Sequence, residues 1–309
     1  MKELHEQVEA EVGKVVVGQR DALEAMLIAV ALNGHVLLEG VPGVAKTLMA
    51  NAAARALGVD FRRIQFTPDL LPSDVTGTVT LRGGDLGFRA GPVFANVVLA
   101  DEVNRTPPKT QAALLEAMQE GQVTVDGEPH PLPDPFLVMA TQNPIEYEGT
   151  YPLPEAQLDR FLMKIDVGYP GEEDELRMLG LGRRGLEPAT LDDVRPVADA
   201  ERLRRLRAQV DETRVTDEVA RYTVGVVRAT RELPSASLGA SPRAAVHLLG
   251  AARAAARLAG RDFVTPDDVA RMAPDVLRHR VMLTPEAELE RQRPADAVAA
   301  ALDTVPVPR

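Results

Sequence analysis

The sequence predicts an α/β domain built on a parallel sheet, followed by a smaller helical domain. Four apolar runs lie in the first half, at residues 35–38, 97–100, 136–140 and 161–163, with 64–66 as a weaker fifth. Each run is almost continuous rather than alternating, which is typical of strands covered on both faces. Helical stretches separate the runs, and strand-like runs disappear after residue 171. We therefore expect a sheet domain over 1–185 and an all-α domain over 186–309.

Glycine and proline mark the helix ends. In the first domain we expect helices at 47–57 and 109–119, because Gly58 and Gly121 follow them. In the second domain, Ser241-Pro242 predicts the start of a helix that reaches about Leu258. Thr265-Pro266-Asp267-Asp268 repeats this signature and predicts a capping box.

Two further segments resemble β-hairpins. Residues 122–125 and those from 128 onward flank Asp126-Gly127, a pair that suits a type I′ turn. Residues 79–81 and 86–88 flank a looser turn and form a second candidate. The pattern alone leaves ordinary surface loops open as an alternative at both places.

Composition excludes several classes of protein. The 309 residues contain no Cys, which removes disulfides, thiol nucleophiles and cysteine metal sites. No uncharged apolar run approaches the ~20 residues that a membrane span needs, and the first residues are charged. The net charge is −11, whereas proteins that bind nucleic acid through phosphates are basic. We expect a cytoplasmic protein without membrane insertion.

The segment between the first apolar run and the helix at residue 47 has the pattern of a phosphate-binding loop. Glycines and a tight turn let backbone N–H groups converge on phosphate oxygens, at the positive end of the following helix. Lys46 would neutralise the β- and γ-phosphates, and the Thr47 hydroxyl would bind Mg²⁺. Ala45 stands where a glycine is usual, and its methyl group is tolerable if this position keeps φ < 0. The predicted loop comprises Gly40, Val41, Pro42, Gly43, Val44, Ala45, Lys46, Thr47 and Leu48.

Polar side chains follow two later apolar runs. Asp101 and Glu102 come directly after 97–100, at the sheet edge where ligands of open α/β sheets bind. Asp101 would hold Mg²⁺ and Glu102 would polarise the attacking water. Asn143 follows 136–140 and could bond the γ-phosphate or orient the water, although a capping Asn before Pro144 is the competing interpretation.

Two arginines complete the candidate site. Arg160 immediately precedes the last apolar run, and Arg243 lies at the second position of the helix that begins at Pro242. Arginine pairs bidentately with phosphate, and an arginine that acts across a subunit contact can accelerate hydrolysis by roughly 10³–10⁵. Taken alone, an arginine of either kind is more often part of a surface ion pair.

With these motifs the chain resembles the MoxR family of AAA+ ATPases. The segments that carry the resemblance run from residue 18 to residue 280, nearly the whole chain, and Ala45 fits the family's usual Gly-x-Pro-Gly-x-Ala-Lys-Thr loop. They are Gly18-Gln19 and residues 40–47, 65–74, 99–105, 107–118, 140–144, 151–161 and 276–280. His279-Arg280, at the end of the last segment, matches the family without an evident role.

The resemblance implies an AAA+ P-loop core with two hairpin insertions and a small helical lid. It also implies binding of ATP and Mg²⁺ and assembly into a ring, typically a hexamer. By motif, Asn143 corresponds to sensor 1, Arg160 to the arginine finger and Arg243 to sensor 2, while Gly18-Gln19 packs near adenine. Family members act as chaperone-like ATPases that mature other proteins or insert metal cofactors, often with a von Willebrand A-domain partner.

Two other functions deserve comparison with a protein-remodelling ring. A nucleic-acid translocase would use the same ATPase but would offer basic residues on its hairpins. The segment 121–134 has no Lys or Arg and three acids, and 79–91 has two arginines against one acid, which disfavours nucleic acid. A nucleotide-gated scaffold that does not hydrolyse ATP is disfavoured because the complete catalytic set is present, namely Lys46, Asp101, Glu102, Asn143 and Arg160.

Overall fold

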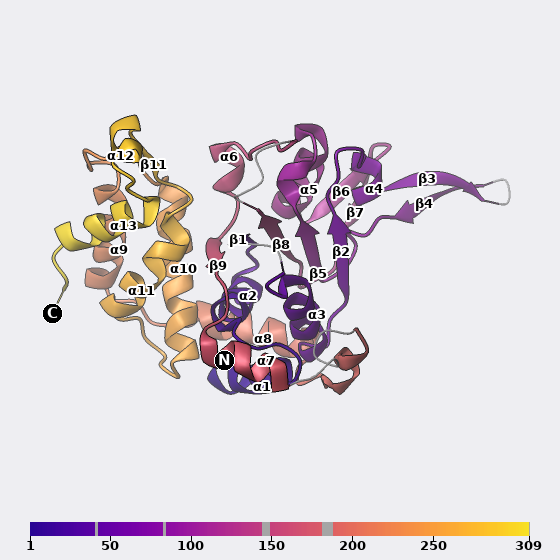
Figure 1. Cartoon of the computed structure of the whole chain (residues 1–309), viewed down its shortest axis with the longest axis horizontal. Coiled ribbons are helices and arrows are strands. Elements are labelled where there is room, and N and C mark those ends of the chain that lie inside the picture. Colours follow the sequence, from indigo (N-terminus) through magenta and orange to yellow (C-terminus); the bar gives the residue numbers. More distant parts are fainter. Residues whose placement is uncertain (41–42, 83–84, 144–148, 181–187, 309) are drawn as a thin grey trace. The chain divides into compact units, whose positions relative to one another are not determined.

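The computed structural model describes residues 1–40, 43–82, 85–143, 149–180 and 188–308, which form two compact units (Figure 1). The sheet unit comprises Glu3–Leu153 and Ile165–Arg204. The helical unit comprises Met1–Lys2, Pro154–Lys164 and Arg205–Arg309. The boundary that we predicted between residues 185 and 186 lies outside the described residues.

A five-stranded sheet in the order β2-β5-β8-β1-β9 forms the centre of the sheet unit. Its strands are β1 (Val36–Gly40), β2 (Phe61–Gln65), β5 (Val97–Asp101), β8 (Leu137–Gln142) and β9 (Met163–Val167). The pairs β2–β5, β5–β8 and β8–β1 are parallel, as predicted. Gln65 lies beside Asp101, and Leu38 lies beside Thr141. The register therefore brings polar residues from three strands to one edge of the sheet.

The interior strands match the continuous apolar runs, but the edge strands differ from them. All side chains of β5 before Asp101 are buried, whereas Arg62 and Arg63 on β2 are exposed. The last strand begins at Met163 rather than at Phe161 and alternates, with Met163, Ile165 and Val167 buried. An edge strand can leave one row of side chains in contact with water, so it lacks the continuous pattern of a buried strand.

Helices cover the sheet and end where glycine allows it. α2 packs against β1 and β8, and α3 packs against β2 and β5. Gly58 and Gly121 follow α3 and α5 with φ of 66° and 63°, in the left-handed region that favours glycine. The helical segments outside the C-terminal bundle are α1 (Lys2–Val12), α2 (Arg20–Leu32), α3 (Lys46–Ala56), α4 (Pro72–Thr76), η1 (Val103–Arg105), α5 (Pro108–Glu120), α7 (Glu172–Gly180), η3 (Pro188–Asp193) and α8 (Ala200–Asp211).

Both predicted hairpins are present in the sheet unit. β3 (Gly77–Arg82) pairs with β4 (Asp85–Ala90), and β6 (Gln122–Val125) pairs with β7 (Glu128–Pro131), both antiparallel. Asp126 and Gly127 have φ of 51° and 84°, so both central residues of this turn have the positive φ of a type I′ turn. Figure 1 shows β3–β4 projecting away from the five-stranded sheet. The Phe88 and His130 rings stack 3.8 Å apart and connect the two hairpins.

The helical unit is a bundle that also contains a short antiparallel strand pair. Its elements are α6 (Glu155–Leu158), α9 (Asp217–Ala229), β10 (Ala236–Leu238), α10 (Pro242–Leu258), α11 (Pro266–Leu277), β11 (Met282–Leu283), α12 (Pro285–Leu289) and α13 (Pro294–Thr304). α10 packs along α9 and α11 through a face rich in alanine. The predicted capping box is present, since Asp268 Oδ2 accepts hydrogen bonds from the Thr265 backbone N–H and hydroxyl. Across the described ranges, no helix is both long and apolar enough to cross a bilayer.

Candidate functional site

The predicted phosphate-binding loop begins at the carboxyl end of β1 and leads into α3. A β-carbon on Gly40 would come within 2.2 Å of the Val167 carbonyl oxygen, so this position requires glycine. Gly43 has φ of 84° and open space around it. Val44 is buried, and Thr47 and Leu48 are half-buried in the first turn of α3. Val41 and Pro42, also predicted for this loop, lie outside the described residues.

Ala45 does not meet the condition under which its methyl group would be free of strain. It caps α3 with φ of 58° and ψ of 24°, so its φ is positive rather than negative. The left-handed conformation costs an alanine about 1–2 kcal/mol because its β-carbon crowds the following carbonyl. The loop therefore keeps the backbone turn that glycine would favour while carrying a methyl group.

Lys46 directs its side chain back over the loop. Its Nζ donates a hydrogen bond to the Gly40 carbonyl oxygen at 2.9 Å. Burial lowers the pKa of the Lys46 ammonium below its usual value, and the negative charges of Asp101 and Glu102 oppose this shift. The structure thus brings the predicted lysine and both predicted carboxylates into one electrostatic cluster.

Asp101 is held by two groups that the sequence analysis did not identify. The Thr141 hydroxyl donates a hydrogen bond to Asp101 Oδ1 at 2.6 Å. Arg63 Nη2 lies 2.7 Å from Asp101 Oδ2 and forms an ion pair. Both partners come from strands beside β5, one on each side. Each carboxylate oxygen of Asp101 therefore has a defined partner.

Glu102 has an unusual backbone and a constrained side chain. Its φ of 57° places it in the left-handed region, and its N–H donates to the Thr141 hydroxyl oxygen at 2.8 Å. Gln65 Nε2 donates to Glu102 Oε2 at 2.7 Å, and Arg105 Nε lies 3.4 Å from the same oxygen. Non-glycine residues in this conformation cluster at functional sites. The Thr141 hydroxyl fixes the two consecutive carboxylate residues together.

The remaining predicted residues of the sheet unit lie near its strand and helix ends. Asn143 is buried immediately after β8. Gly18 has φ of 83°, and the buried Gln19 caps the start of α2. Both line a cavity of about 350 Å³ that also has apolar walls from Val16 and Leu23. Its lining also includes charged side chains, so the cavity combines apolar and polar walls.

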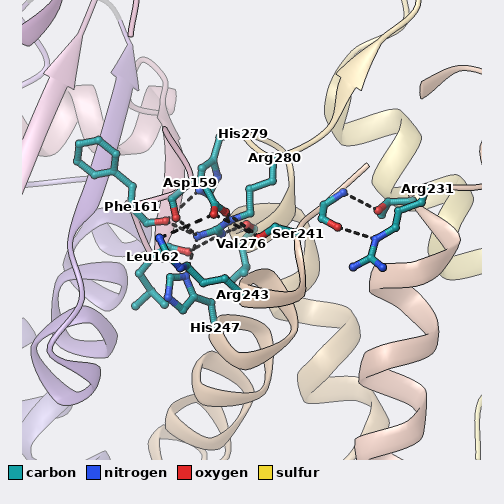
Figure 2. Close-up of polar contacts among 12 residues, drawn as sticks. Asp159, Phe161, Leu162, Arg231, Ser241, Arg243, His247, Val276, His279 and Arg280 are labelled. Atoms are coloured by element: carbon teal, nitrogen blue, oxygen red, sulfur yellow. Dashed lines mark hydrogen bonds and ion pairs between the residues drawn. The ribbon is translucent and has the colours of Figure 1, made fainter. Parts of the chain in front are cut away.

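Arg160 and Arg243 belong to the helical unit. Figure 2 shows Arg243 together with Asp159 and Phe161, the residues on either side of Arg160. Arg243 lies in the first turn of α10, with its Nη1 3.9 Å from Asp159 Oδ2. The half-exposed Arg160 follows Asp159 directly. Arg243 thus lies near the carboxylate of Asp159, and Arg160 is the next residue in the chain. The predicted lysine and the two predicted carboxylates belong to the sheet unit.

Arg63, Gln65, Thr141 and Arg105 form the part of the site that sequence reasoning missed. A signal did exist, because Gln65 and Thr141 are polar residues at the carboxyl ends of strands. The order of the strands, which puts β2 and β8 on the two sides of β5, was needed to connect them with Asp101 and Glu102.

Comparisons with known proteins agree with this arrangement. The profile of the AAA family (ATPases associated with various cellular activities) matches residues 35–163, and an AAA lid-domain profile matches residues 228–301. YeaC of Bacillus subtilis, an uncharacterized protein, is 52% identical over 96% of this chain and 92% of its own length. Chaperone MoxR1 of Mycobacterium tuberculosis is 47% identical over 97% of this chain and 81% of its own length.

Among solved structures, a candidate ATPase from Cytophaga hutchinsonii matches with a TM-score of 0.92 and 43% sequence identity. The match covers 100% of this chain and 96% of the other. At this identity the likeness extends beyond the fold class.

Proposed function

The chain belongs to the MoxR family of AAA+ ATPases and is an enzyme that hydrolyses ATP, and we propose that it does so as a ring, a hexamer, that remodels or matures partner proteins. One observation carries the proposal for the site. Lys46 lies within electrostatic range of Asp101 and Glu102 at the carboxyl edge of a parallel sheet, where a glycine-containing loop enters a helix. This is the place where open α/β sheets bind phosphorylated ligands.

ATP binding is proposed for the loop together with the cavity described above. The triphosphate would take the place of the Gly40 carbonyl as partner of Lys46, whose partly buried ammonium gains a strong charge-assisted contact. The cavity beside Gly18 and Gln19 is proposed for adenine, because it combines apolar walls with a buried amide.

The residues present fit a magnesium ion that arrives with the nucleotide. Mg²⁺ prefers oxygen ligands and is usually held by one or two carboxylates plus phosphates and water. Among the described residues, no group of three or more His, Asp or Glu side chains could hold a metal ion by itself. Thr47 and Asp101 would hold Mg²⁺, which when bound neutralises phosphate charge.

Hydrolysis is proposed to depend on Glu102 as the group that polarises water. The Thr141 and Gln65 hydrogen bonds fix the backbone and the carboxylate of Glu102, so its orientation does not depend on a free rotamer. Asn143, buried at the end of the adjacent strand, is proposed to contact the γ-phosphate. Such positioned groups contribute about 10²–10⁴-fold to a rate.

Arg243 is proposed to sense the γ-phosphate, and Arg160 is proposed to act on the nucleotide of a neighbouring subunit. The Arg160 guanidinium makes no hydrogen bond or ion pair with any residue in the described part of the chain. Its charge is therefore available for a partner subunit. An arginine supplied in this way stabilises the charge of the transition state.

Protein clients are proposed for two reasons. MoxR1, at 47% identity, is named a chaperone. The β6–β7 hairpin carries Asp126 and Glu128 and no Lys or Arg, while Leu81 and Leu86 on β3–β4 are 69% and 76% exposed. Exposed leucines suit protein surfaces better than phosphates. A von Willebrand A-domain partner, insertion of a metal or cofactor into the client, and a cytoplasmic location are parts of this proposal.

The test uses two variants of the full chain. Glu102→Gln should bind ATP and assemble but hydrolyse it very slowly, whereas Lys46→Ala should fail to bind ATP. Client proteins should then co-purify with Glu102→Gln in the presence of ATP and not with Lys46→Ala. Normal turnover by Glu102→Gln would remove Glu102 from its role, and salt-sensitive capture of DNA in place of protein would favour a translocase.

A further inference from the structure

Arg280, which follows α11, is an arginine buried in the helical unit. Its side chain is only 1% exposed. A buried guanidinium is strongly unfavourable unless a negative charge and hydrogen-bond acceptors surround it. The acceptors of its hydrogen bonds therefore identify the segment that Arg280 stabilises.

All five donors of Arg280 are directed at specific acceptors, as Figure 2 shows. Nε donates to Asp159 Oδ1 at 2.7 Å. Nη1 donates to the carbonyl oxygens of Leu162, at 3.2 Å, and of Val276. Nη2 donates to the carbonyl oxygens of Asp159 at 3.1 Å and Phe161 at 2.5 Å, and lies 2.7 Å from His247 Nδ1. Three of the four carbonyls belong to the segment 159–162.

These contacts hold the backbone on both sides of Arg160. Asp159 lies before it, and Phe161 and Leu162 lie after it. His279 adds a further bond, since its Nε2 lies 3.1 Å from the Phe161 carbonyl oxygen. The Arg160 side chain itself has no hydrogen-bond or ion-pair partner within the ranges described. The backbone of this residue is fixed while its guanidinium stays available.

The carboxylate of Asp159 also reaches the start of α10. The Ser241 hydroxyl donates to Asp159 Oδ1 and Oδ2 at 3.2 and 3.3 Å, and Arg243 lies 3.9 Å away. Segment 159–162 is therefore tied to the end of α11 and to the first residues of α10. It groups with the helical unit although it leads directly into strand β9.

We propose that Arg280 and Asp159 are positioning residues that hold Arg160 in the orientation needed to act on the nucleotide of a neighbouring subunit. This inference rests on the trans-acting role of Arg160 proposed above. It assigns a role to a buried ion pair 121 residues apart in sequence. It also implies that Arg160 follows every displacement of α10 and α11.

A purely structural pair would affect stability alone, so the test separates stability from turnover. Arg280→Lys keeps the charge but cannot reach all these acceptors, and Arg280→Gln removes the charge. Both should lower kcat by roughly 10- to 100-fold, the effect of misplacing a catalytic group by about 1 Å, with KM for ATP changed less than about twofold.

The matched control is Arg261→Gln. Arg261 forms a bidentate pair with Asp268, with Nη1 and Nη2 at 2.7 and 2.6 Å from its oxygens, but has no contact with segment 159–162. It should lower the melting temperature and leave kcat unchanged. An equal loss of kcat in Arg261→Gln and Arg280→Lys at matched melting temperature would overturn the positioning role.

Mixed assemblies distinguish this inference from the proposed function beneath it. Lys46→Ala protomers cannot use ATP but carry an intact Arg160. A mixture of Lys46→Ala with Arg280→Gln should hydrolyse ATP faster than the sum of the two proteins measured separately. A mixture of Lys46→Ala with Arg160→Ala should do the same. If turnover is restored in the mixture with Arg160→Ala but not in the mixture with Arg280→Gln, the role of Arg280 is overturned and that of Arg160 stands. Restoration in neither mixture would overturn the trans-acting role of Arg160 itself.

Discussion

Gln65 on β2 donates a hydrogen bond of 2.7 Å to the carboxylate of Glu102, the residue that follows β5. The two strands are neighbours, and Gln65 lies beside Asp101 in their register. The group proposed to polarise water is therefore oriented from the adjacent strand rather than by its own segment.

Gln65→Leu should lower kcat by about 10- to 100-fold and leave ATP affinity nearly unchanged. Leucine has a similar size but cannot donate, and a hydrogen bond to a charged group contributes about 1.5–3 kcal/mol. Steady-state ATPase assays and equilibrium titration with a fluorescent ATP analogue would separate the two effects. An unchanged kcat would show that Glu102 is oriented without Gln65.

Arg63→Met should reduce the magnesium concentration needed for half-maximal ATPase activity. Arg63 pairs with Asp101 Oδ2, so it competes with any cation that binds this carboxylate. The pair is partly exposed, and such pairs contribute about 0.2–1 kcal/mol, which corresponds to a shift of at most about fivefold. Arg62→Met, the next residue on the same exposed strand, is the matched control. A higher magnesium requirement would mean that Arg63 positions Asp101 instead.

The effect of substitutions at Ala45 on stability should depend on how well the new residue tolerates positive φ. Ala45→Gly should change the free energy of unfolding by less than about 1 kcal/mol, because relief of the left-handed conformation is offset by the greater freedom of glycine in the unfolded chain. Ala45→Val should destabilise the protein and weaken ATP binding, since a β-branched side chain is strained at positive φ. Thermal unfolding and ATP titration of both variants provide the measurement. Equal stability of the two would contradict the observed turn.

Acid should destabilise the sheet unit through His35. This side chain accepts the Val138 N–H at Nδ1 and contacts the Met118 carbonyl through Nε2, so it is neutral when folded. Burial lowers its pKa from 6.5 to about 4. The unfolded chain therefore takes up the proton first, and about 3 kcal/mol is lost as pH falls from about 6.5 to about 4.

The control for this effect is His35→Leu. It should be less stable at neutral pH, because the Val138 N–H and the Met118 carbonyl lose their partner, but its stability should vary less between pH 6.5 and 4. Urea unfolding at several pH values tests this difference. A parallel pH dependence of the two proteins would assign the acid sensitivity to other groups.

Sequence patterns predicted the interior of the fold better than its edges. β1, β5 and β8 are covered on both faces, so their apolar runs are continuous and easy to recognise. β9 alternates Met-Lys-Ile-Asp-Val, and its polar residues lie outside the apolar run 161–163 that predicted this strand. Helix ends were predictable because Gly58 and Gly121 adopt conformations that other residues avoid.

In the candidate site, too, some residues could be predicted from local sequence motifs and others could not. Lys46, Asp101 and Glu102 lie in short motifs whose spacing follows from one strand and one loop. Arg63 and Thr141 act through the order of strands in the sheet, which no local pattern states. Arg280 resembles an ordinary basic residue after a helix until its partners more than 100 positions earlier are known.

Besides the first two residues, the helical unit draws on two separate stretches of the chain, 154–164 and 205–309, and this constrains how the family can diversify. Recombination that exchanged residues 205–309 alone would import Arg280 without the aspartate that compensates its charge. Positions 159 and 280 should therefore covary among homologues, and a working chimera should inherit residues 154–164 from the same parent as its C-terminal bundle.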